Sequence, residues 1–146
     1  MKNPVLRILS IDDDPSCQRV VAQYMTIVGG HMVETALNGS EGLKKAADIK
    51  PDVILLDMAM PDMSGAEVLE SLHSDPATRH IPVVILTGSE LMDSGSALYK
   101  NTNLKHIAHK PAIFEDLLRK IETLLLHAPG ASDTGPRPDL TDWKKY

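Results

Sequence analysis

The sequence has few of the residues that mark several large classes of protein. A single cysteine among 146 residues excludes an intrachain disulfide framework and a cysteine-rich zinc site. Aromatic residues make up only 3%, so the core must be aliphatic, and the net charge of −5 argues against a broad nucleic-acid surface. No apolar run approaches the roughly 18–20 residues of a membrane span, and the N-terminus lacks the apolar stretch of a signal peptide. We therefore expect a cytoplasmic protein.

The sequence does contain an alternation of short apolar runs with helical patterns. Strands are predicted over residues 5–11, 32–36, 52–57, 82–87 and 105–109. Helices are predicted from Pro15, after Asn38, through Val68 and Leu72, more weakly over 90–100, and over 114–127. Apolar strands joined by helical crossovers predict an α/β protein, with a doubly wound, five-stranded parallel sheet and five helices on its two faces.

The composition changes at residue 128. Five proline and glycine residues fall within the ten residues from Pro129 to Pro138, which is typical of a linker or a disordered tail. Two of the five aromatic residues of the chain, Trp143 and Tyr146, nevertheless lie in this segment. We therefore expect one domain over residues 1–127, followed by a tail over residues 128–146.

Acidic, hydroxyl and ammonium side chains follow the predicted strands. Asp12 and Asp13 come after the first strand, Asp57 ends the third, Thr87 ends the fourth, and Lys110 follows the fifth. The carboxyl ends of the strands form the ligand-binding edge of an open parallel sheet, so these groups should converge there. Clustered carboxylates suit a hard divalent ion such as Mg²⁺. An aspartate beside such an ion and a lysine is suited to accept a phosphoryl group.

These motifs resemble the receiver domain of bacterial two-component response regulators. The resemblance runs from about Val5 to His127 and is specific because all the motifs occur in order and at matching spacing. It rests on Ile8-Leu9-Ser10-Ile11-Asp12-Asp13-Asp14-Pro15, Asp57-Met58-Ala59-Met60-Pro61-Asp62-Met63-Ser64-Gly65, Ile85-Leu86-Thr87 and His109-Lys110-Pro111. It implies a flavodoxin-like fold with strand order 2-1-3-4-5.

The resemblance also implies a Mg²⁺ site and a phosphorylated residue. Asp57 would be the phosphoacceptor and a metal ligand. Asp13 would bind the ion more directly and Asp12 largely through water, and the backbone carbonyl of Ala59 would be a further ligand.

Two further residues would act on the phosphoryl group by the same resemblance. Lys110 would pair with the phosphoryl oxygens, and Thr87 would donate a hydrogen bond to one of them and move inward on phosphorylation. The implied partners are a sensor histidine kinase or phosphotransfer protein, and a downstream protein or a following output domain. Direct contact with nucleic acid or a membrane is not expected, and no enzymatic activity is expected beyond the domain's own phosphorylation and dephosphorylation.

The sequence departs from the family pattern at a few positions. Ile107 stands where receivers usually have an aromatic residue whose rotamer couples to the threonine, which puts that coupling in doubt. The segment before the fifth strand is rich in serine and glycine, so we expect a divergent or mobile fourth helix there. Ala59 and Ser89 are small and uncharged, so we expect no unusually fast loss of the phosphoryl group.

Several nearby residues have simpler interpretations as structural residues. Asp14 is expected to be a helix cap, Asp62 a turn residue and Cys17 a packing residue of the first helix. The three methionines at 58, 60 and 63 are expected to pack rather than to form a partner groove. His106 and His109 are expected to be surface or packing residues rather than metal ligands.

Two other functions are considered. A haloacid-dehalogenase-type phosphohydrolase could use the aspartates after the first strand, with Thr87 and Lys110. It needs a further strand ending in an acidic pair, and it leaves Asp57 unexplained. A receiver-like interaction module that works without phosphate is the second alternative, and its best support is Ile107.

Overall fold

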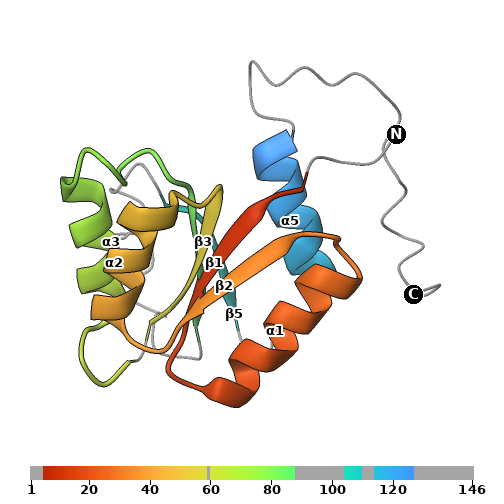
Figure 1. Cartoon of the computed structure of the whole chain (residues 1–146), viewed down its shortest axis with the longest axis horizontal. Coiled ribbons are helices and arrows are strands. Elements are labelled where there is room, and N and C mark those ends of the chain that lie inside the picture. Colours follow the sequence, from red (N-terminus) through yellow and green to blue (C-terminus); the bar gives the residue numbers. More distant parts are fainter. Residues whose placement is uncertain (1–4, 59, 88–103, 110–113, 127–146) are drawn as a thin grey trace.

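The computed structural model describes residues 5–58, 60–87, 104–109 and 114–126 (Figure 1). In chain order its elements are β1 (Arg7–Ile11), α1 (Pro15–Ile27), β2 (Met32–Ala36), α2 (Gly39–Ile49), β3 (Val53–Asp57), α3 (Gly65–Ser74), β4 (Val83–Thr87), β5 (Leu104–His109) and α5 (Phe114–Leu126). The helix predicted over residues 90–100 lies outside the described residues.

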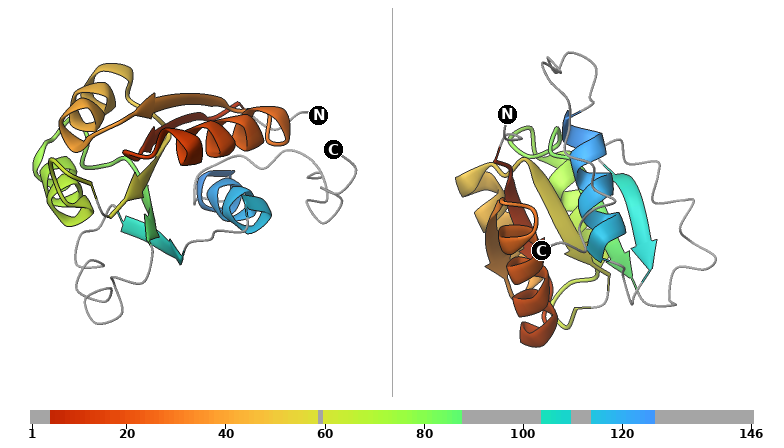
Figure 2. Two further views of the ribbon diagram at one scale, coloured as in Figure 1. Left: turned by 90° about the horizontal axis from the view of Figure 1, so that it is seen from below. Right: turned by 90° about the vertical axis from the view of Figure 1, so that its right-hand side faces the viewer.

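The strands form one parallel sheet in the order β2-β1-β3-β4-β5. Helices α1 and α5 lie on one face of the sheet, and α2 and α3 lie on the other (Figure 2). The central strand β3 is buried along its whole length, which explains why it has no polar residue before Asp57. The predicted parallel, flavodoxin-like α/β fold is confirmed.

Two aliphatic cores fill the space between the sheet and its helices. Because side chains alternate along a strand, Leu9 and Ile11 of β1 enter the core beneath α2 and α3, while Ile8 enters the core beneath α1 and α5. Eight of the eleven buried residues of the second core are leucine, isoleucine or methionine, and Cys17 packs against it, as predicted.

The helices begin at the residues that the sequence indicates. The side chain of Asp14 accepts hydrogen bonds from the backbone N–H groups of Ser16 and Cys17, and Pro15 is the first helical residue of α1. Asn38 caps α2 by accepting from the N–H of Glu41. The predicted capping role of Asp14 is confirmed.

A buried polar pair connects α5 to the start of β2. His31 Nδ1 accepts a hydrogen bond from the N–H of Leu6 at 3.1 Å, and Nε2 lies 3.6 Å from Oε1 of Glu122 on α5. Both side chains are at most 4% exposed. Since Nδ1 is an acceptor, the proton of the neutral imidazole is assigned to Nε2, on the side that faces the carboxylate.

Among the described helices, none is long and apolar enough to cross a membrane.

Candidate functional site

Three aspartates meet at the carboxyl edge of the sheet. Strands β1 and β3 are neighbours, and Ile11 pairs with Leu56, so Asp12 and Asp57 occupy matching positions one residue further along. The carboxylate oxygens of Asp12, Asp13 and Asp57 include three that all lie within 4.8 Å of one another. The predicted convergence of these three residues is therefore present in the structure.

The burial of the three carboxylates differs. Asp12 and Asp57 are 4% and 7% exposed, whereas Asp13 is exposed. Three negative charges so close together repel one another unless a positive charge neutralises them. All the donor atoms are oxygens, and the exposed Asp13 leaves the cluster open to solvent. Three carboxylates leave room in the coordination shell for several water molecules. These are the properties of a Mg²⁺ site, and the residues present fit that ion.

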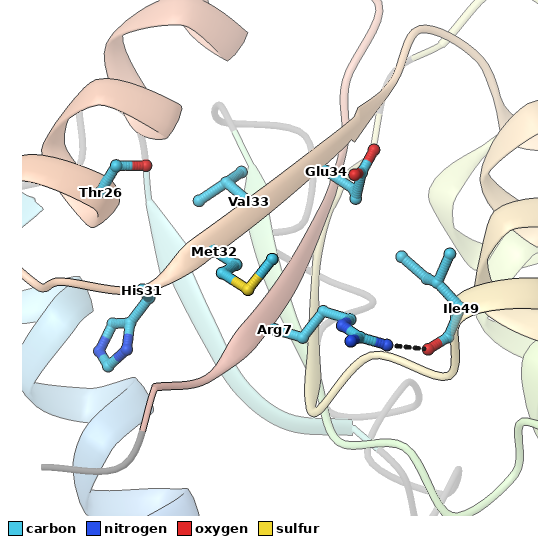
Figure 3. A pocket seen from close by; sticks show the side chains of 7 residues that line it. All are labelled: Arg7, Thr26, His31, Met32, Val33, Glu34 and Ile49. Carbon is cyan, nitrogen blue, oxygen red and sulfur yellow. Dashed lines mark hydrogen bonds between the residues drawn. The ribbon is translucent and has the colours of Figure 1, made fainter.

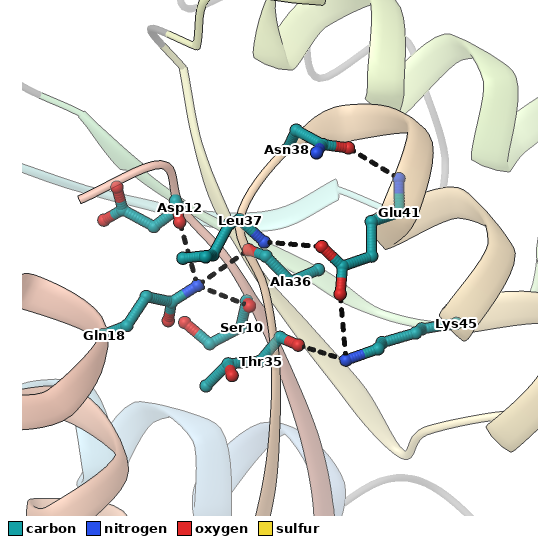
Figure 4. A network of polar contacts seen from close by, with 9 residues as sticks. All are labelled: Ser10, Asp12, Gln18, Thr35, Ala36, Leu37, Asn38, Glu41 and Lys45. Atoms are coloured by element: carbon teal, nitrogen blue, oxygen red, sulfur yellow. Dashed lines mark hydrogen bonds and ion pairs between the residues drawn. The ribbon is translucent and has the colours of Figure 1, made fainter. Parts of the chain in front are cut away.

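The loop after β1 is held by backbone contacts and by one buried side chain. The N–H of Asp12 donates to the carbonyl oxygen of Ala36 at 3.0 Å, and Asp12 Oδ1 accepts from the N–H of Asp14 at 3.0 Å. The buried amide of Gln18 donates from α1 to carbonyl oxygens at the ends of β1 and β2 (Figure 4). The Asp12-Asp13 turn is therefore anchored to β2 and to α1.

The loop after β3 is anchored to α2. Asp62 Oδ1 accepts from the N–H of Gly39 at 2.9 Å, and Oδ2 accepts from the N–H and the hydroxyl of Ser40 at 3.1 and 3.2 Å. These donors, the N–H of Gly39 foremost, lower the pKa of Asp62. Asp62 lies in the bend after β3, as predicted, and its side chain in addition binds the N-terminus of a helix more than twenty residues away. This contact could not be predicted from the sequence, because the two residues lie 23 positions apart.

The start of α3 lies directly behind the candidate acceptor. The N–H of Gly65 donates to the carbonyl oxygen of Met58 at 2.8 Å. A Cβ at Gly65 would come within 2.8 Å of the carbonyl oxygen of Asp57 and 2.7 Å of Met58 Cα. Met58, Met60 and Met63 pack against the core under α2 and α3, as predicted.

The remaining predicted site residues are placed only in part. Thr87 is the last residue of β4, which pairs with β3, so its backbone lies at the same edge of the sheet as Asp57. Ile107 lies in β5 opposite Ile85. Ala59 and Lys110 lie outside the described residues, although β5 ends at His109, immediately before Lys110. Ser89 also lies outside them.

The buried polar residues Gln18 and His31 were not predicted from the sequence. Gln18 could have been noticed, because it shares the buried face of α1 with Val21 and Met25 at spacings of three and seven residues. His31 follows a glycine pair and precedes an edge strand, and nothing in that pattern indicates its burial.

A hollow away from the acidic edge does not resemble a reaction site. It is an open pocket of about 560 Å³ around β2 and the start of β1, and its lining includes Arg7, His31, Met32 and Ile49 (Figure 3). Arg7 Nη1 is already bonded to the carbonyl oxygen of Ile49 at 3.0 Å. The three clustered aspartates are not part of its lining, so the acidic edge remains the candidate site.

Comparison with known proteins decides the family. Residues 8–122 match the response regulator receiver domain. The chain belongs to this family. Receiver domains typically act in phosphorelays of two-component systems and bind Mg²⁺ at an acidic pocket. The match spans the three aspartates, Thr87 and Lys110, and it confirms the resemblance on which the sequence prediction rests.

Individual relatives differ greatly in length. The chain is 34% identical over 119 residues to protein PilH of Pseudomonas aeruginosa, covering 82% of this chain and 97% of PilH. It is 32% identical over 118 residues to hybrid signal transduction histidine kinase D of Dictyostelium discoideum, covering 81% of this chain but only 7% of that protein. A receiver domain structure from Methanospirillum hungatei is 30% identical, with a TM-score of 0.76 and coverage of 85% of this chain and 96% of that one.

Proposed function

We propose that this receiver domain accepts a phosphoryl group on Asp57. The carboxylate oxygen of Asp57 attacks phosphorus of a phosphohistidine or a small phosphodonor, and the bond from phosphorus to the donor nitrogen or oxygen breaks with its electron pair going to the donor. The product is an aspartyl phosphate. The observation that carries the proposal is the place of Asp57, which ends β3 within 4.8 Å of the carboxylates of Asp12 and Asp13.

The acidic cluster would hold one Mg²⁺. Asp12, Asp13, Asp57 and the carbonyl oxygen of Ala59 would be its ligands, directly or through water. When bound, the ion supplies positive charge that stabilises the phosphoryl oxygens during transfer. The contacts of Asp12 with Ala36 and Asp14 hold its carboxylate in position before the ion binds. Asp13 is exposed, so solvent and the ion can reach the cluster past its side chain.

Two residues would complete the site on its other side. We assign Lys110, after β5, to pair with the phosphoryl oxygens, and the hydroxyl of Thr87 to donate a hydrogen bond to one of them. The support is topological: β4 and β5 follow β3 in the sheet, and their carboxyl ends lie at the same edge as Asp57.

The phosphorylated domain would act by changing its contacts with other proteins. The phosphodonor would be a sensor histidine kinase or a phosphotransfer protein of the cytoplasm, and the receiver of the signal a downstream protein or a following output domain. With a net charge of −5, the chain itself is a poor candidate for direct nucleic-acid contact. We assign residues 1–127 to the domain and residues 128–146 to a linker or tail, on composition alone.

Intact mass spectrometry tests the proposal. Wild type, Asp57→Asn and Asp52→Asn are incubated with a small phosphodonor with and without Mg²⁺. Asp52 is a suitable control because it is an exposed acid at the opposite end of β3. We expect one added phosphoryl group in wild type and Asp52→Asn, only with Mg²⁺, and none in Asp57→Asn.

A receiver-like module that works without phosphate is the second candidate, and Ile107 favours it. In that case a phosphoryl mimic such as beryllofluoride would leave the NMR signals of the backbone amides unchanged. The dehalogenase-type alternative loses its basis, because the receiver family accounts for Asp57 and the loop after it.

A further inference from the structure

Gln18 makes an unusual set of contacts next to the acidic cluster. Its Nε2 atom lies 2.8 Å from the carbonyl oxygen of Ser10, 3.1 Å from that of Asp12 and 2.9 Å from that of Ala36 (Figure 4). The side chain belongs to α1 and is only 4% exposed. Two amide hydrogens are therefore shared among three backbone acceptors at the ends of two strands.

Two of these acceptors, the carbonyl oxygens of Ala36 and Asp12, lie where the pairing of the strands stops. The register of β1 and β2 ends at Ile11 and Ala36, and the last backbone contact beyond it runs from the N–H of Asp12 to the carbonyl oxygen of Ala36. β2 provides no further strand residue to pair with Asp12. The Gln18 amide takes the place of that missing strand partner, because it donates to the carbonyl oxygen of Asp12 from the helix.

The amide contributes donors and little else. Gln18 Oε1 is buried and has no hydrogen-bond partner among the described residues. The reverse orientation of the amide would place Oε1 against three carbonyl oxygens, so the contacts themselves fix the assignment. The position therefore specifically requires an N–H donor, at the cost of a buried acceptor left without a bond.

From these contacts we infer that Gln18 is a positioning residue for the metal site. It fixes the peptide group that joins Asp12 to Asp13, and thereby the place of both carboxylates relative to Asp57. Mg²⁺ tolerates little departure from octahedral geometry, so a small shift of this turn weakens its binding. This inference rests on the proposed function, because it needs the acidic cluster to bind Mg²⁺.

The test replaces the donors without changing the size of the side chain. Gln18→Met keeps a long, unbranched side chain and removes both N–H groups. The matched control is Thr78→Val: Thr78 is 2% exposed, and its hydroxyl donates to the carbonyl oxygen of Leu72 at 2.8 Å. That control also removes a buried hydrogen bond to the backbone, but it lies before β4, at the opposite edge of the sheet.

Binding of Mg²⁺ is measured by titration calorimetry, together with the Tm of each variant and the rate of phosphorylation. We expect Gln18→Met to raise the Kd for Mg²⁺ about tenfold, at the lower end of the effect of outer partners on metal sites. Its phosphorylation rate should recover at saturating Mg²⁺. Thr78→Val should lower the Tm without changing the Kd. If Gln18→Met does not fold, Gln18→Asn, whose shorter amide cannot reach all three acceptors, should also raise the Kd.

Three results would overturn the inference. A Kd unchanged in the folded Gln18 variant, or equally raised in Thr78→Val, would show that Gln18 matters only for stability or not at all. In either case wild type still binds Mg²⁺ and is phosphorylated, so the proposed function stands. Wild type that binds no Mg²⁺ would instead remove the proposed function, and this inference with it.

Discussion

At the scale of single residues, the buried polar groups are the clearest indicators of function and of structural constraint in this domain. Asp57 and Asp12 are buried at the reactive edge, Gln18 supports Asp12 from α1, and His31 faces Glu122 far from that edge. A buried polar group is costly unless it is paired, so each of these residues indicates a function or a structural constraint.

Replacement of His31 tests the pair beneath α5. His31→Ala removes the acceptor of the Leu6 N–H, leaves the buried carboxylate of Glu122 facing a cavity, and should lower the free energy of unfolding by about 2–4 kcal/mol. Chemical denaturation measures this value. His80→Ala is the control, because His80 is exposed, and it should stay within about 0.5 kcal/mol of wild type. Equal stability of the two variants would contradict the assigned role.

At the scale of elements, the described residues of the loop between β3 and α3 make contacts far along the chain. Asp62 binds the N-terminus of α2, and the methionines of the loop pack on the core. Gly65 lies close to the backbone of Asp57 and Met58. The loop that follows the acceptor is therefore coupled to the position of α2.

The contact of Asp62 with α2 should depend on pH. The N–H groups of Gly39 and Ser40 lower the pKa of Asp62 in the folded state. Its contribution to stability is therefore complete above the unfolded-state pKa and is lost as the pH falls through the lower folded-state pKa. We expect the Tm of Asp62→Asn to lie a few degrees below that of wild type at pH 7, and the difference to close in strong acid.

Asp48→Asn is the control for this measurement, since Asp48 is exposed on α2. Its Tm should follow that of wild type across the same pH range. A Tm difference between wild type and Asp62→Asn that persists unchanged below the folded-state pKa would contradict the assigned contact.

Gly65→Ala tests the close approach of α3 to the acceptor. The added methyl group would lie 2.8 Å from the carbonyl oxygen of Asp57 and 2.7 Å from Met58 Cα, and backbone atoms cannot move aside by changing a rotamer. We expect a loss of about 1–3 kcal/mol in unfolding free energy and slower phosphorylation of Asp57. Glu70→Ala, exposed on the same helix, should change neither quantity appreciably. Wild-type stability in Gly65→Ala would contradict the packing described.

At the scale of the whole molecule, one sheet with two aliphatic cores brings the ends of separate strands together. This arrangement was predictable from the sequence, because continuous apolar strands such as β3 can be buried only between two layers of helices. The acidic site was predictable for the same reason: Asp12 and Asp57 each follow a strand, and parallel strands end at one edge.

The supporting contacts were not predictable from the sequence. Asp62 and Gly39 lie 23 residues apart and meet only because α2 and α3 pack side by side. Gln18 and His31 act through buried backbone groups, which have no signature in the order of residues. Such contacts depend on where elements come to rest, rather than on local propensity or spacing.

The acidic edge should also make the stability of the whole domain depend on Mg²⁺. At ten times its Kd the ion should add about 1.4 kcal/mol to the free energy of unfolding, which corresponds to a rise in Tm of about 5 °C. Asp13→Asn relieves charge repulsion, so without Mg²⁺ its Tm should equal or exceed that of wild type. With Mg²⁺ its Tm should rise less. An equal rise in both proteins would place the ion elsewhere.

The central claim is that Asp57 itself carries the phosphoryl group, and mapping the modified residue tests it most directly. After incubation with phosphodonor and Mg²⁺, borohydride converts an aspartyl phosphate to homoserine, which peptide mass spectrometry locates. We predict homoserine at position 57 and at no other aspartate. Homoserine at position 12 or 13, or at none of the three, would contradict the account.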